Sequence, residues 1–155
     1  MMLDEVLKGH TFTGGLADRH VARLAALARE VSFEENEAIL LAGQQSEHFY
    51  LLLSGSVCIE VNTRVCTVCV QALGPGEAFG WSALLDHHDT LFQVRARERS
   101  AALYLNGADL SAAFREDPEL AAEMLRRTLR LVAGRVQAAE AQLSELCGMR
   151  MQKNV

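Results

Sequence analysis

Hydrophobic and polar positions change their spacing twice along the chain. Apolar residues recur at helical spacing from Gly15 to Glu30, which predicts an amphipathic helix near the N-terminus. From Val31 to Leu105 they fall instead in short runs separated by polar or glycine-bearing turns, a pattern typical of β-strands. Helical spacing returns after Asp117-Pro118, and proline is favoured at the first position of a helix.

Many short strands with turns between them favour a barrel or a sandwich, and no segment has the pattern of a βαβ unit. A short helix is expected at 110–114, before the long one. The expected strands cover residues 31–33, 38–41, 49–53, 57–61, 65–73, 91–96 and 101–105. The sequence therefore predicts a mainly β (α+β) fold, with a β body and its N-terminal helix in 1–116 and a C-terminal helix in 117–155.

Glycine and proline punctuate the stretch from Leu73 to Leu85. Pro75-Gly76 is a strong turn signal, because proline fixes φ and glycine adopts the positive φ that many turns need. Gly80 then precedes Ser82-Ala-Leu-Leu85, a run that can form a short helix. A glycine before a helix start lets a ligand approach the backbone, where free N–H groups favour an anion. The stretch therefore predicts an anion cradle.

Apolar residues on the long C-terminal helix alternate steps of four and three, which is the seam of a heptad repeat. A parallel two-stranded coiled coil would bring Arg135 close to Glu140 of the second copy, an attractive pair. The alternative is a helix face that covers its own domain. We favour the homodimer. The seam consists of Leu125, Leu129, Val132, Val136, Ala139, Leu143 and Leu146.

Composition and charge exclude several classes of function. Half of the 155 residues are apolar, an ordinary globular composition for one domain. The net charge of −5 argues against non-specific nucleic-acid binding. No apolar run approaches the length of a membrane span and no signal peptide is visible, so we expect a cytoplasmic protein. No nucleophile–base constellation or metal-ligand spacing stands out, so we expect neither an enzyme nor a metal site.

Four cysteines are present, at positions 58, 66, 69 and 147. Cys66-x-x-Cys69 has the spacing of a metal or redox motif. It lies in an apolar run, however, and on a strand two residues three apart point to opposite faces. We therefore expect reduced thiols that share no zinc ion.

Five segments together resemble the cyclic nucleotide-binding domains of the catabolite-activator (Crp/Fnr) superfamily. They are Phe49-Tyr-Leu-Leu-Leu-Ser-Gly55, Leu73-Gly-Pro-Gly-Glu-Ala-Phe-Gly80, Ala83-Leu-Leu85, Val94-Arg-Ala96 and Asp109-Leu110, in the family's order and spacing. The resemblance covers nearly everything from Leu16 to Leu146. It implies a β-roll, or jelly-roll-like barrel, with an N-terminal helix and a long C-terminal helix that often dimerises.

The resemblance identifies the glycine-rich stretch as the cassette that binds the cyclic phosphate. Its ligand-binding positions are Phe79, Gly80, Trp81, Ser82, Ala83, Thr90 and Leu91. Trp81 stands where the family has a glutamate for the ribose hydroxyl, and Thr90 where it has an arginine for the phosphate. A lost charge-assisted contact typically costs about 1.5–3 kcal/mol, or roughly ten- to a hundredfold in affinity. A cyclic nucleotide is thus a candidate ligand for which weak or altered binding is expected.

Three features leave alternatives open. Trp81 is either a stacking platform for a base or another aromatic ligand, or a structural indole that fills the nucleotide pocket or packs on the rim of the barrel. Arg95 and Arg97 are either solvated or, with a bulge in their strand, within reach of the cassette. His87 and His88 are either an exposed loop pair without a role, or a pair that favours an anion or a partner at lower pH or binds a metal.

The expected function is a non-enzymatic sensor module in which a small-molecule effector shifts the C-terminal helices. The alternative is a degenerate, ligand-free domain that serves as a dimeric scaffold or binds another protein. The family's helix-turn-helix would need a further segment after Val155. We therefore expect no direct DNA binding and no membrane association.

Overall fold

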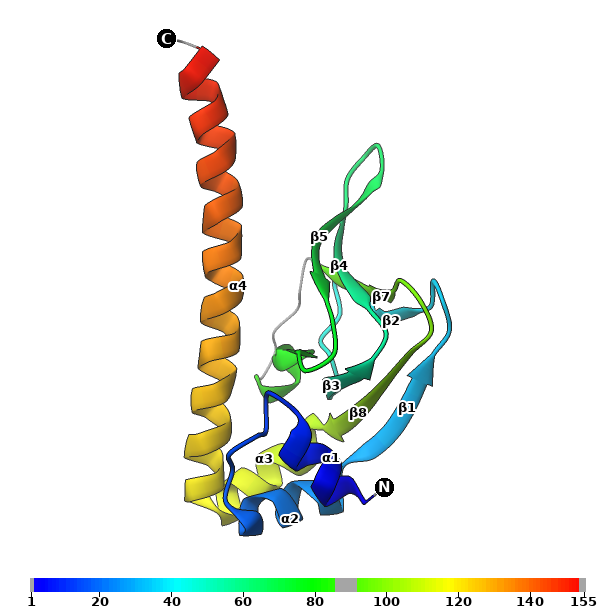
Figure 1. The fold of residues 1–155 in the computed structure, drawn as a ribbon, viewed down its shortest axis with the longest axis vertical. Helices are drawn as coiled ribbons and strands as arrows, with labels where there is room; N and C mark the ends of the chain where they lie inside the picture. The colour runs from blue at the N-terminus through cyan, green and yellow to red at the C-terminus, as the bar shows by residue number, and fades with distance from the viewer. Residues whose placement is uncertain (1, 86–91, 154–155) are drawn as a thin grey trace. The chain divides into compact units, whose positions relative to one another are not determined.

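Two antiparallel sheets of four strands each form the body of the chain (Figure 1). The structure is a computed structural model and describes residues 2–85 and 92–153. The first sheet has the strand order β1-β8-β3-β6 and the second the order β2-β7-β4-β5. The strands are β1 (Arg29–Phe33), β2 (Ala38–Leu40), β3 (His48–Ser54), β4 (Val57–Asn62), β5 (Thr67–Leu73), β6 (Ala78–Phe79), β7 (Gln93–Ala96) and β8 (Ser100–Asn106).

The two sheets share one hydrophobic core. Successive side chains of a strand point to opposite faces, so alternate residues of each strand enter this core. The core residues are Phe33, Tyr50, Leu52, Phe79 and Ala102 from the first sheet and Val57, Leu73, Val94 and Ala96 from the second. The predicted β-roll with flanking helices is confirmed.

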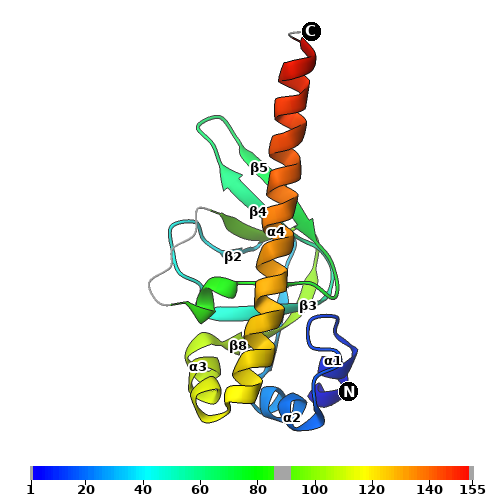
Figure 2. The ribbon, with the colours of Figure 1, turned by 90° about the vertical axis from the view of Figure 1, so that its left-hand side faces the viewer.

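Short helices lie at one end of the sheets, and the β4–β5 hairpin extends from the other end (Figures 1 and 2). The helices are α1 (Leu3–Gly9), α2 (Asp18–Leu27) and α3 (Gly107–Glu116), and the 3₁₀ helix η1 (Trp81–Leu84) follows β6. α2 is shorter than predicted because Ala28 is already extended and the next residues continue as β1. The sequence pattern missed α1, which has seven residues and buries Leu7.

The long helix α4 (Pro118–Lys153) begins at the predicted proline. Asp117 caps it, because its Oδ1 accepts a hydrogen bond from the Leu120 N–H at 3.2 Å. The chain divides into two compact units, Met1–Ala121 and Ala122–Val155. Five apolar residues of the predicted seam are exposed, namely Leu125, Leu129, Val136, Leu143 and Leu146. Among the described helices, none combines the length and the apolar character that a membrane crossing requires.

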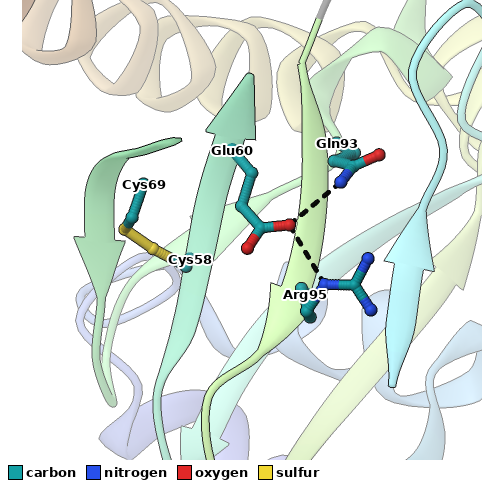
Figure 3. Close-up of a disulfide and its surroundings, with 5 residues drawn as sticks. All are labelled: Cys58, Glu60, Cys69, Gln93 and Arg95. Carbon is teal, nitrogen blue, oxygen red and sulfur yellow. Dashed lines mark hydrogen bonds and ion pairs between the residues drawn. A yellow bond between two sulfur atoms is a disulfide. The ribbon is translucent and has the colours of Figure 1, made fainter. Parts of the chain in front are cut away.

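The prediction of reduced thiols at Cys66 and Cys69 is wrong for Cys69. Cys58 on β4 and Cys69 on β5 form a disulfide (Figure 3). The pairing of β4 with β5 shifts its register between Ile59 and Glu60, so Cys69 lies opposite Glu60. Sequence alternation assumes an unbroken period of two and therefore does not reveal such a bulge. Cys66 and Cys147 are free and exposed.

Candidate ligand-binding site

The glycine-rich stretch is held against β3 by its turn. Gly76 has a φ of +90°, the positive φ expected for the Pro-Gly turn. The Gly76 N–H donates to the Leu52 carbonyl at 3.0 Å, and the Leu52 N–H donates to the Glu77 carbonyl at 2.9 Å. β6 then pairs with β3, with Phe79 opposite Tyr50. The stretch thus enters the site as an added edge strand of the first sheet.

Gly80 turns the chain from β6 into η1. Its φ is +82°, and a Cβ at this position would lie 2.5 Å from the His48 carbonyl oxygen. Only glycine therefore fits without a shift of the backbone. The predicted short helix is present as a single 3₁₀ turn, in which the Ala83 N–H donates to the Gly80 carbonyl at 3.1 Å.

The β2–β3 loop and the start of α3 hold η1 from two sides. The Ser46 N–H donates to Ser82 Oγ at 3.3 Å, and Gln45 Nε2 donates to the carbonyls of Ser82 and Leu85. On the α3 side, a Cβ on Gly107 would lie 2.3 Å from the Ala83 carbonyl oxygen. These contacts fix the cassette against the body of the chain.

A pocket of about 550 Å³ lies between β2, the β2–β3 loop and the start of β3. This volume falls within the range of small-molecule sites. Its lining residues are Ala38, Ile39, Leu40, Leu41, Gln44, Gln45, Ser46, Glu47, His48 and Tyr50. The sequence does not predict this pocket, because the polar residues of the loop are equally typical of an ordinary turn.

Tyr50 connects the pocket to the cassette. Its ring stacks on Phe79, with centroids 4.8 Å apart and planes 12° apart. Burial is the largest cause that raises the pKa of the Tyr50 phenol, and the nearby Tyr104 and Glu47 raise it further. Tyr50 therefore stays a neutral phenol at neutral pH. It offers an aromatic surface and a hydroxyl, and no charge.

The charge of the pocket does not suit a phosphate. Glu47 is the acidic residue of its lining, and no arginine or lysine is among the described residues that line it. The amides of Gln44 and Gln45 add neutral hydrogen-bonding groups. Glu47 is exposed to solvent, so its carboxylate repels an anion placed here only weakly, but the described lining offers that anion no lysine or arginine as a partner.

Five of the seven predicted cassette residues lie within the described part of the chain. Phe79, Gly80 and Ser82 are buried, whereas Trp81 and Ala83 are half-buried. Trp81 begins η1 and is not among the residues that line the pocket. The remaining cassette residues, Thr90 and Leu91, and the histidine pair, His87 and His88, lie outside the described residues.

Arg95 forms its hydrogen bonds with Glu60 and Asn36, which lie outside the cassette. Its Nε donates to Glu60 Oε1 at 3.1 Å, and its Nη1 donates to the Asn36 carbonyl at 2.7 Å. Gln93 donates to the same Glu60 oxygen at 3.0 Å, so the three side chains form a ladder across β4 and β7 (Figure 3). Arg97 is exposed. In residues 2–85 and 92–153 no group of three side chains is arranged to hold a metal ion.

Comparison with known proteins identifies the family. The family model of the cyclic nucleotide-binding domain matches residues 30–117. The chain is 29% identical to a proposed potassium channel protein of Rhodopseudomonas palustris over 115 residues, 74% of this chain and 27% of that protein. It is 26% identical to the type II regulatory subunit of the Drosophila melanogaster cAMP-dependent protein kinase, over 73% of this chain and 28% of that one. The chain thus spans little more than a quarter of these relatives.

Solved structures have the same fold. A proposed cyclic nucleotide-binding protein from Geobacter metallireducens is 25% identical with a TM-score of 0.76, over 88% of this chain and 99% of that one. The catabolite activator protein of Thermus thermophilus is also 25% identical, with a TM-score of 0.71 over 88% of this chain and 63% of that one. A mutant regulatory subunit of a cAMP-independent protein kinase A from Trypanosoma brucei, bound to cAMP, is 23% identical, with a TM-score of 0.69 over 92% and 49%.

Proposed function

The chain belongs to the cyclic nucleotide-binding domain family, and from this premise we propose that it is a regulatory sensor module without tight cyclic-nucleotide binding. The observation that carries the proposal is the charge of the pocket. Glu47 lies in its lining, whereas the described lining residues include no arginine or lysine. A cyclic nucleotide carries one negative charge, which this lining does not neutralise.

The cassette sequence supports the same proposal. Trp81 replaces the glutamate that would accept a hydrogen bond from the ribose hydroxyl, and the indole can only donate one. Thr90 replaces the arginine that would pair with the phosphate. The effector that fits better is a neutral or cationic small molecule with an aromatic group, because the pocket combines the Tyr50 ring, glutamine amides and the Glu47 carboxylate.

Calorimetric titration of the chain with cAMP and cGMP tests this proposal. We expect no tight binding by the natural sequence. In the double variant Trp81→Glu with Thr90→Arg, each restored contact should raise the affinity by about ten- to a hundredfold. The Thr90→Arg part of this design has a parallel in the Trypanosoma subunit, since one of the three substitutions in its cAMP-bound mutant replaces threonine by arginine.

Glu47→Gln provides a matched control for the charge of the pocket. This substitution removes the carboxylate and keeps the size of the side chain. The backbone carbonyl of residue 47, which accepts the Gly107 N–H at 2.9 Å, is retained. We expect Glu47→Gln to improve the affinity for an anionic nucleotide and to weaken the affinity for a cationic ligand. Equal changes for both ligand charges would contradict the electrostatic argument.

Such a module would transmit the binding of its ligand through α4. We propose that α4 forms a homodimer. The support is the row of exposed apolar residues at heptad positions, which includes Leu129, 68% exposed, and Leu143, 61% exposed. Light scattering at micromolar concentration should give the mass of two chains, and Leu129→Glu should give the mass of one. A single-chain mass for the natural sequence would contradict the dimer.

The second candidate is a ligand-free scaffold that binds another protein. The observation that favours it is the contact between Gln45 and the carbonyls of Ser82 and Leu85, by which the chain's own side chain holds the pocket loop on the cassette. A thermal-shift screen against nucleotides and aromatic amines separates the two candidates. Stabilisation by one compound class supports the sensor, whereas no shift with any compound supports the scaffold.

A further inference from the structure

The β4–β5 hairpin carries three of the four cysteines of the chain. Cys58 lies on β4 and is 3% exposed, whereas its disulfide partner Cys69 lies on β5 and is exposed. Cys66 is a free, exposed thiol three residues before Cys69. β5 is the last strand of its sheet, so the bridge joins the edge strand to its neighbour.

A bulge in the hairpin brings the two bridged cysteines together. Near the base of the hairpin Cys58 pairs with Ala72 and Ile59 with Gln71, and this register would place Cys69 opposite Val61. Cys69 would then point to the face opposite Cys58. The register shifts after Ile59, so Cys69 pairs with Glu60 instead. The Cα atoms of the two cysteines are 5.8 Å apart, within the range that a disulfide spans.

The two sulfur atoms of this bridge differ in their access to solvent. Because Cys69 is exposed and Cys58 is covered, an external thiol can approach the bridge from the Cys69 side. Beyond the bridge, the tip of the hairpin has Val65 94% exposed, and hydrogen bonds centred on Thr63 hold its turn. The bridge is therefore a covalent cross-link beside an exposed, lightly packed edge of the sheet.

We propose that Cys58–Cys69 is a reversible redox site that controls the order of the outer β4–β5 hairpin. The thiolate of a small dithiol attacks Cys69 Sγ, and the bond between the two cysteines breaks. Cys58 leaves as a thiolate and takes up a proton, while Cys69 forms a mixed disulfide with the reductant. The second thiol of the reductant then displaces Cys69. The reductant ends as a disulfide, and two electrons and two protons have passed to the protein.

The test is a redox titration of the full chain in reduced and oxidised dithiothreitol, without denaturant. Alkylation followed by mass spectrometry reports the state of each cysteine, and hydrogen exchange reports the order of the hairpin. We expect a reversible two-electron transition of Cys58 and Cys69. Reduction should remove the protection of amides in 60–70 and leave that of β3 and β8 unchanged. Cys147→Ser should leave the titration as it is.

Two single variants test the predicted direction of attack. In Cys58→Ser the exposed Cys69 should form a mixed disulfide with oxidised glutathione, whereas in Cys69→Ser the covered Cys58 should not. Modification of Cys58 as readily as Cys69 would overturn this direction. The redox site itself is overturned if the bridge is reduced only after unfolding in urea, or if all four thiols stay free in oxidised dithiothreitol. These two results come from the natural sequence and do not depend on the folding of a variant.

Discussion

Replacing Gly80 with alanine should destabilise the cassette by an amount that the structure bounds. The positive φ of +82° costs a side-chain-bearing residue about 1–2 kcal/mol. The new Cβ would also lie 2.5 Å from the His48 carbonyl oxygen and 3.3 Å from Tyr50 Cδ2. Overpacking of this kind adds about 1–3 kcal/mol, because β3 has to move away. The expected loss in the free energy of unfolding is therefore about 2–5 kcal/mol.

Gly43→Ala is the matched control for this substitution. Gly43 has nearly the same φ, +80°, but a Cβ there would meet no atom within 4 Å. The free energy of unfolding of Gly43→Ala should therefore fall by the backbone contribution alone, about 1–2 kcal/mol. Urea unfolding followed by fluorescence is a suitable assay, because Trp81 is the one tryptophan of the chain and follows Gly80 directly. Equal losses in the two variants would refute the close approach of Gly80 to β3.

Two further predictions concern stability. His10 Nδ1 accepts the Phe12 N–H at 3.1 Å, and burial lowers the pKa of His10 below its ordinary value of 6.5. Between the lowered and the ordinary pKa the unfolded chain binds more protons, so stability should be complete above pH 6.5 and fall as the pH drops through this window. Urea unfolding midpoints measured at several pH values report this loss of stability. The loss should be smaller in His10→Asn. Gly134→Ala should raise the thermal midpoint through about 1 kcal/mol of helix propensity, because a Cβ there meets nothing within 4 Å.

The strands could be predicted because their apolar runs end at glycine and polar turns. Leu52, Leu73 and Val94, which lie on three of the predicted strands, are buried in the core. The helix α1 could not, because seven residues give little periodic signal. The pairing of Cys58 with Cys69 also escaped prediction, since it depends on a register shift that follows from pairing between strands and not from either strand alone.

The candidate site was predictable in part. Gly80 and the short helix after it follow from local backbone chemistry, and the structure contains both. The pocket depends on how a polar loop, residues 41–47, folds back over β2 and Tyr50. Such a contact between distant segments has no local signature. For the same reason, Glu47 became relevant to the charge of the site only in the folded structure.

Titration of the natural chain with cAMP by calorimetry tests the central claim most directly. The pocket places Glu47 in its lining and, among its described residues, no arginine or lysine to pair with the phosphate. The predicted result is no saturable heat at micromolar nucleotide. A dissociation constant of about 1 μM, equivalent to about −8 kcal/mol, would contradict the claim.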